Sequence, residues 1–288
     1  MIKKYRFNKE HLVRAILTIF ALSSLLFLFL IFIFILFEGL PLFLKIGLNK
    51  IILGFKWAPT KDSFGIFPMV VSSFLVTFGA LVIGAPLGLS CAIYLSEYSG
   101  KKTKMFLKPA LELLAGIPSV VYGFLGVIYI VPLVRNYLGG SGFSLLSTSI
   151  VLGVMILPTI ISISFDAIVS VPKTYREGSF AMGATKWQTI YKVIIPSAKS
   201  GILASFILGM GRAIGETMAV IMIAGNALKI PTSILDPLRT LTGNIALELA
   251  YATGDHRLSL FSTGVVLLVI IMILNYIANF GIKRKVLK

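Results

Sequence analysis

Residues 201–225 read GILASFILGMGRAIGETMAVIMIAG, and this stretch decides the kind of fold that the chain adopts. Arg212 and Glu216 interrupt an otherwise apolar run, which is long enough to cross a bilayer because about 20 helical residues span the hydrocarbon core. Charge at membrane depth is costly, so an ionisable residue there indicates a functional site and needs a partner. Glu216 is the predicted partner of Arg212, since residues four apart lie on one face of a helix.

A second pattern runs beside this charged pair. Gly211 and Gly215 form a GxxxG pair, which is typical of places where two membrane helices pack closely. The stretch therefore predicts one stripe for helix packing and a neighbouring stripe for a polar path.

The composition of the whole chain agrees with a membrane protein. Of its 288 residues 57% are hydrophobic, and the mean hydropathy is +0.95. The net charge of +16 does not indicate a nucleic-acid partner, because the basic residues lie in loops and no basic stripe is interleaved with aromatic residues. The single cysteine and the two histidines predict neither a disulfide nor a metal site, and no cluster typical of a catalytic site is present.

Hydrophobic runs predict an all-α, polytopic bundle of six spans in the plasma membrane. Their approximate bounds are 12–37, 66–96, 107–134, 144–168, 201–225 and 259–281. The first run is too long for a cleaved signal peptide. Eighteen Lys and Arg residues fall in segments assigned to the inside and eight in segments assigned outside, which predicts that both termini are cytoplasmic. We expect residues 1–65 to form an N-terminal span with an external segment, and 66–288 to form the core.

The segment 167–200 predicts two short helices outside the membrane. Pro172 suits the first turn of a helix that runs to about Met182, where Gly183 is a natural stop. Thr185 and Gln188 then form a capping-box pattern. The second helix has an apolar face at helical spacing, and Pro196 is expected to end it. That face consists of Trp187, Ile190, Tyr191 and Ile194.

Two interpretations of this helix pair are open from the residues alone. Its apolar face rests on the bundle, while the small residues Gly178, Ser179 and Ala181 fit the groove of a partner. Alternatively, the pair packs only on its own protein.

A family resemblance favours the first interpretation. Glu177-Gly178-Ser179, then Gly183 and later Val193-Ile194-Ile195-Pro196, resemble the EAA loop of ABC importer permeases, with Gly and Ser in place of two alanines. In that family the loop is the coupling helix seated on the ATPase subunit. The resemblance therefore implies that Glu177, Gly178, Ser179, Gly183 and Pro196 belong to an ATPase contact.

Other stretches resemble phosphate importer permeases, and among them the PstC type. They are FGIFP at 64–68, GAPLG at 84–88, AIYLSEY at 92–98, LAGIPSVVYG at 114–123 and GRAIGETMAV at 211–220. The resemblance implies a type I importer permease (MetI-like) core. It also implies a homologous PstA-like permease, two ATPase subunits, an external phosphate-binding protein and phosphate as partners, besides the lipid bilayer.

The chain itself is not expected to be an enzyme or to bind a cofactor. It lacks the GxxxxGK[ST] loop that cradles nucleotide phosphates, so ATP and Mg would be used by the partner ATPase.

Arg212 offers a planar fork of donors suited to phosphate oxygens, and Glu216 would neutralise it between turnovers. The alternative for this pair is a structural ion pair. Alternatives for the function are import of another oxyanion (sulfate, molybdate or tungstate) and an ATPase-independent carrier.

Overall fold

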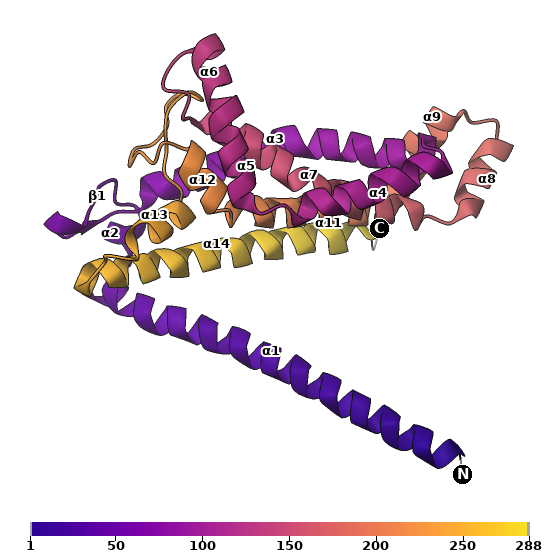
Figure 1. Ribbon diagram of the computed structural model, residues 1–288, viewed down its shortest axis with the longest axis horizontal. Coiled ribbons are helices and arrows are strands. Elements are labelled where there is room, and N and C mark those ends of the chain that lie inside the picture. The colour runs from indigo at the N-terminus through magenta and orange to yellow at the C-terminus, as the bar shows by residue number, and fades with distance from the viewer. Residues whose placement is uncertain (1, 287–288) are drawn as a thin grey trace.

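The computed structural model describes the backbone of residues 2–286 and the side chains of residues 10–277. It is a bundle of helices with one small hairpin (Figure 1). The longer helices are α1 (Ile2–Ile46), α3 (Phe67–Ile93), α4 (Lys101–Gly116), α7 (Leu145–Val169), α11 (Lys199–Ile214) and α14 (Gly254–Val286). The shorter ones are α2 (Leu48–Ile52), α5 (Ser119–Leu125), α6 (Val131–Leu138), α8 (Lys173–Ala181), α9 (Lys186–Thr189), α10 (Ile195–Ser197), α12 (Met218–Ile223) and α13 (Leu241–Glu248).

Three π-helical turns and one two-stranded hairpin complete the fold. The π turns are η2 (Tyr94–Tyr98), η3 (Gly126–Ile130) and η4 (Ile190–Ile194). Strands β1 (Trp57–Ala58) and β2 (Ser63–Phe64) pair antiparallel around the 3₁₀ turn η1 (Pro59–Lys61).

The predicted all-α polytopic bundle is confirmed. In the part of the chain that the structure describes, five helical segments are long and apolar enough to span a membrane. They are Glu10–Ile46, Phe67–Tyr98, Ser119–Leu138, Leu145–Val169 and Gly254–Ile277. A sixth span results if Lys186–Ser197 and Lys199–Ile214, which meet at 69°, are counted together.

The bounds predicted for the third span were wrong. The run 107–134 is divided at Ile117, which has an extended ψ of 128° and precedes Pro118. A residue before proline is disfavoured in a helix, so α4 ends at Gly116 and the span starts again at Ser119. The hydroxyl of Tyr122 donates to the Leu114 carbonyl across this break (2.8 Å).

Helices α3 and α7 form the centre of the bundle, and small residues allow them to pack closely. A Cβ atom on Gly84 would lie 2.8 Å from Ile156, and one on Gly153 would lie 3.2 Å from Ile83. Ile156 and Ala80 are fully buried between them. This tight contact makes α3 and α7 the rigid core against which the other helices are arranged.

The bundle has two different ends. One end carries α8 and α9, and the opposite end carries the hairpin, α2 and α13 (Figure 1). Helix α1 contacts α14 near the hairpin end, where Ser262 donates to the Gly39 carbonyl (2.7 Å). From there α1 diverges from the bundle, and its beginning and the end of α14 both point toward the α8–α9 end (Figure 1).

Candidate functional site

The stretch 201–225 is not one helix, and this corrects the pairing predicted from it. Helix α11 ends at Ile214, and α12 begins at Met218. Glu216 lies in the break, where its Oε1 accepts a hydrogen bond from the Ala219 amide (3.1 Å). The first amides of a helix have no helical acceptor, and a carboxylate satisfies them well. Glu216 therefore caps α12 and forms no ion pair with Arg212.

Arg212 takes a different partner. It is half-buried on the last turn of α11, and its Nη1 donates to Thr159 Oγ1 on α7 (3.2 Å). Among the side chains of residues 10–277, no carboxylate forms an ion pair with its guanidinium. Arg212 is thus held by one neutral hydroxyl, which leaves most of its five donors available.

Thr159 was missed by sequence reasoning. It follows Pro158 inside α7, and a polar residue beside a proline in an apolar span was the available signal. Without the tertiary structure, nothing connects it to a residue 53 positions later.

The GxxxG pair is not packed by any described helix of this chain. A Cβ atom on Gly211 would meet nothing within 4 Å, and one on Gly215 would meet only the Gly211 carbonyl. The close contacts of α11 are instead at Gly201, against Ala167, and at Gly209, against Ile160. The helix packing predicted at Gly211 and Gly215 stays a prediction.

Helix α13 closes the bundle beside the break. Thr242 Oγ1 donates to the main-chain carbonyl of Glu216 (2.9 Å), and the Leu241 amide donates to Ser73 Oγ on α3 (3.0 Å). Leu241 and Asn244 are fully buried. The segment after α12 therefore folds back into the bundle, which its apolar sequence alone did not show.

A buried carboxylate holds this end together. Glu248, at the end of α13, accepts hydrogen bonds from Arg239 Nη1 (2.6 Å), His256 Nε2 (2.8 Å) and Trp57 Nε1 (2.9 Å). Its side chain is only 9% exposed. Glu248 was missed because its three partners lie on different elements, and Trp57 is 191 positions away in the sequence.

The loop before α13 has its own carboxylate. Asp236 Oδ2 accepts from the Thr232 amide and hydroxyl (both 2.9 Å) and from the Ser233 amide (3.1 Å). These bonds favour the charged form, and with the weaker attraction of Lys229 they hold the pKa of Asp236 below its ordinary value.

At the other end, the helix pair begins and turns as predicted. Gly183 follows α8 with a φ of 79°, the left-handed conformation of a helix-ending glycine. Thr185 and Gln188 make both bonds of the capping box. Glu177 and Gly178 are exposed, and Ser179 Oγ contacts Thr189 Oγ1 (2.9 Å), which ties α8 to α9.

Two details of this pair were predicted wrongly. Pro196 does not end the helix, because the π turn η4 precedes it and α10 continues to Ser197. The wider turn accommodates a proline that cannot donate a backbone hydrogen bond. The apolar face is also divided, since Ile190 and Ile194 are 1% exposed whereas Trp187 and Tyr191 are 62% and 63% exposed. The two exposed rings stack on each other (6.4 Å between centroids).

Arg176 attaches α8 to the bundle. Its Nη2 donates to Glu97 Oε1 (2.7 Å) in η2 and to the Ile168 carbonyl (3.0 Å) in α7, and its Nη1 donates to the Val171 carbonyl (2.7 Å). On α9, the Lys186 ammonium lies over the Tyr98 ring, 4.4 Å from its centroid. Sequence reasoning assigned no role to these residues.

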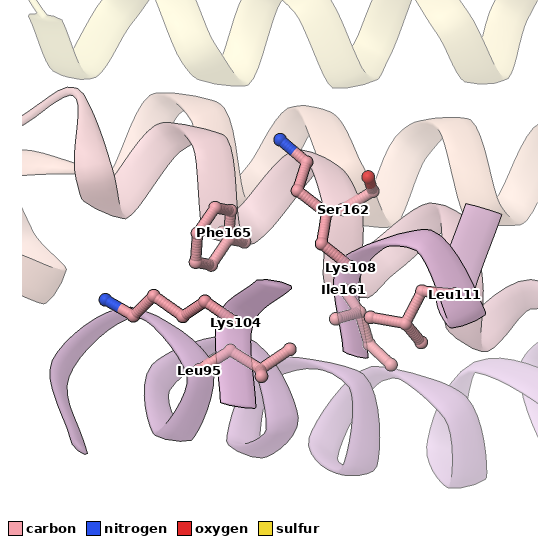
Figure 2. Close-up of a pocket in the computed structure, with 7 residues that line it drawn as sticks. All are labelled: Leu95, Lys104, Lys108, Leu111, Ile161, Ser162 and Phe165. Carbon is pink, nitrogen blue, oxygen red and sulfur yellow. The ribbon is translucent and has the colours of Figure 1, made fainter. Parts of the chain in front are cut away.

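A small pocket lies between the end of α3, α4 and α7, near the same end of the bundle. Figure 2 shows Lys104 and Lys108 beside Phe165 and three aliphatic side chains. The Lys104 ammonium donates to the Ser96 carbonyl (2.9 Å), and Lys108 pairs with Asp166 (3.5 Å). Its volume of about 10 Å³ is too small for a solute larger than one water molecule.

The chain combines several apolar spans, a part-buried arginine at a helix break and an exposed helix pair at one end. Together these features define a membrane transport protein. A family model described as "Binding-protein-dependent transport system inner membrane component" matches residues 84–286. The chain therefore belongs to this family of ABC importer permeases, and it is of the PstC type. Permeases of this family work with an ATPase and a substrate-binding protein.

Relatives and solved structures agree with this assignment. The chain is 43% identical over 284 residues to the probable ABC transporter permease protein YqgH of Bacillus subtilis, covering 95% of this chain and 91% of that protein. It is 34% identical to the phosphate transport system permease protein PstC of Mesorhizobium japonicum, covering 79% and 76%.

Among solved structures, a bacterial ABC transporter for alginate import gives a TM-score of 0.66 at 17% identity, covering 94% of this chain and 96% of that one. The MetNI methionine transporter gives 0.57 at 20% identity, covering 77% and 94%. These likenesses confirm the type I importer (MetI-like) fold.

Proposed function

We propose that this chain is one of two permease subunits of an ATP-driven phosphate importer. It forms half of the translocation pathway, and a homologous PstA-like permease forms the other half. An external binding protein delivers phosphate, and two ATPase subunits that use ATP and Mg contact the α8–α9 pair. The chain itself binds no cofactor and hydrolyses no ATP.

The observation that carries the proposal is the state of Arg212. A guanidinium at membrane depth without a carboxylate is costly, so it is retained for what it binds. Its planar fork matches the oxygens of a tetrahedral oxyanion, and its single hydrogen bond to Thr159 orients it without neutralising it. Such a site attracts the anion and still releases it, which transport requires.

The break between α11 and α12 also has a role in the proposed transport. Glu216 caps α12 and is held through its carbonyl by α13, so its carboxylate is separate from Arg212 in this conformation. Because only Gly215 and Thr217 flank it in the break, a change of backbone there brings the carboxylate within reach of the guanidinium. Glu216 then competes with the anion for Arg212 and promotes its release.

The orientation that we propose is supported by the two ends of the bundle. The beginning of α1, the end of α14 and α8–α9 lie toward the same side (Figure 1), and the segments on that side carry most of the basic residues. By the positive-inside rule this side is cytoplasmic, where ATP is available. The exposed Glu177, Gly178 and Phe180 on α8 and the stacked rings on α9 form the ATPase contact.

Substrate choice is the part that needs a direct test, because an arginine fork also fits sulfate, molybdate and tungstate. The wild-type chain would be reconstituted in proteoliposomes with its candidate sister permease, ATPase and binding protein. ATP hydrolysis and uptake would be measured with each anion in turn. We expect stimulation by phosphate, a loss in Arg212→Ala, and partial activity in Arg212→Lys, which keeps the charge but not the fork.

The matched control is Arg135→Ala, since Arg135 is an exposed arginine in the last turn of α6 whose side chain, among the described residues, bonds the nearby Ser141 carbonyl. It should transport normally. Stimulation by another anion alone would overturn phosphate and keep the importer. Normal phosphate uptake by an assembled Arg212→Ala transporter would refute the role of Arg212.

A further inference from the structure

Both helices of the α8–α9 pair contact one short segment, the π turn η2 at the end of α3. Glu97 Oε1 in this turn accepts a hydrogen bond from Arg176 Nη2 of α8 (2.7 Å). The ammonium of Lys186 on α9 lies over the neighbouring Tyr98 ring, 4.4 Å from its centroid. The Arg176 and Glu97 side chains are only 20% and 10% exposed. Breaking an ion pair shielded in this way is costly, because it leaves one buried charge without a partner.

Helix α8 has little else to hold it. None of its nine residues is buried, and Gly178 has open space around it. Besides Arg176, its side-chain hydrogen bond among the described residues is the one between Ser179 and Thr189 on α9. Besides the chain connection through Val171, the Arg176 guanidinium therefore provides the direct side-chain link from α8 to the ends of α3 and α7.

This guanidinium joins three helices at one point. It bonds Glu97 at the end of α3 and the Ile168 and Val171 carbonyls at the end of α7. Helices α3 and α7 are the tightly packed centre of the bundle, and α7 also carries the Thr159 hydroxyl that holds Arg212. A displacement of α8 thus has a continuous mechanical connection to the partner of the pathway arginine.

We propose that the Arg176–Glu97 ion pair passes the movement of the ATPase-bound α8 to α3 and α7, with η2 as the segment that receives it. This inference rests on the proposed ATPase contact of α8. A π turn is rare and wider than an α-helical turn, and it often marks a functional position. Arg176 acts through Glu97 and the Ile168 and Val171 carbonyls, so it is a positioning residue.

The experiment measures whether α8 and η2 move as one body during ATP hydrolysis. Spin labels would be placed at Lys101→Cys, next to η2, and at Met182→Cys, at the end of α8, after replacing the only native cysteine by Cys91→Ser. In the complete reconstituted transporter, the distance distribution between the labels should stay narrow with and without ATP. With Arg176→Ala it should broaden when ATP is added.

The second readout is the coupling between ATP hydrolysis and the loaded binding protein. The ratio of ATPase activity with the loaded binding protein to the basal activity should fall at least about fivefold in Arg176→Ala and in Glu97→Ala. Because the two residues act as a unit, the double variant should lose no more than either single one. Arg176→Lys, which keeps the ion pair but not the fork to the carbonyls, should recover part of the ratio.

The matched control is Lys108→Ala. It removes the exposed Lys108–Asp166 pair at the same end of the bundle, which does not involve α8, and should change neither readout. Co-purification of the ATPase would show that each variant assembles.

Three results would overturn the inference: a narrow distribution in Arg176→Ala, an unchanged coupling ratio, or additive losses in the double variant. A wild-type complex that hydrolyses ATP but ignores phosphate overturns only the phosphate part of the proposed function, because the distance readout still decides the ion pair. A wild-type chain that binds no ATPase overturns both.

Discussion

Replacing Glu248 should release the end of the bundle that carries the hairpin and α13. The Glu248 carboxylate accepts hydrogen bonds from Trp57, Arg239 and His256, which lie on β1, on the loop before α13 and on α14. Glu248→Ala removes the only carboxylate that pairs with Arg239 among the described side chains, while Arg239 itself stays 15% exposed. An uncompensated buried charge is then the main consequence.

The expected loss is large for one substitution. Breaking a buried ion pair by removing one partner costs about 3–5 kcal/mol. The bonds from Trp57 and His256 are each worth about 1.5–3 kcal/mol as bonds to a charged group, but contributions within one network are not additive. Arg239 also keeps its bonds to the Asn226 carbonyl (3.1 Å) and to Asn244 (3.0 Å). We therefore expect about 3–5 kcal/mol in total.

Trp57 provides a direct optical probe of this change. The chain has two tryptophans, Trp57 at 7% and Trp187 at 62% exposure, so a Trp187→Phe background isolates the buried one. In Glu248→Ala, the emission of Trp57 should shift to longer wavelength as the hairpin opens to water. Thermal unfolding of the purified protein in detergent should begin at a clearly lower temperature.

The control is the neighbouring Asp255→Ala. Asp255 forms an ion pair with Lys45 at the start of α14, but the two side chains are 34% and 62% exposed. Such a pair is worth at most about 1 kcal/mol. The reasoning is refuted if Glu248→Ala melts within experimental error of Asp255→Ala, or if Trp57 emission is unchanged while Arg239 remains in place.

Three further predictions concern packing, backbone conformation and pH. Gly79→Ala should cost about 1–3 kcal/mol through overpacking, because its Cβ would lie 2.8 Å from the Ser149 Cβ, and thermal unfolding should show partial recovery on adding Ser149→Gly. Gly183→Ala should destabilise the α8–α9 turn by about 1–2 kcal/mol, because Gly183 has a φ of 79°. Gly178→Ala should not destabilise it, because Gly178 has open space around it within α8. Local amide exchange would distinguish the two variants. The stabilisation of the 232–236 loop by Asp236 should be fully present above pH 3.8 and be lost as the pH falls through the lowered pKa. The protection of the loop amides from exchange should therefore fall over this pH range in the wild type and not in Asp236→Asn. The same fall in Asp236→Asn would contradict the prediction.

The features that sequence reasoning predicted correctly are those that depend on neighbouring residues. The capping box at Thr185 and the left-handed Gly183 follow from local backbone chemistry, which the rest of the protein did not alter. Four apolar runs appear as spans close to their predicted positions, because the hydrophobic requirement of a bilayer acts on each run separately.

The features that were missed depend on contacts across the chain. The pairing of Arg212 with Glu216 assumed that a helix continues through Gly215, but α11 ends there and α13 holds the break through the Glu216 carbonyl. The apolar face of α9 was recognised, yet its spacing could not show that Ile190 packs inward while Trp187 stays exposed.

The sequence by itself determined that this is a polytopic permease with two short helices on either side of Gly183, because hydropathy, basic residues in loops and the EAA-like spacing are properties of the chain read in order. Only the tertiary structure decided which polar groups meet. Arg212 meets Thr159 and Arg176 meets Glu97 across 53 and 79 positions. Such partners are fixed by how α3, α7 and α11 pack and where helices break, and these depend on many side chains at once.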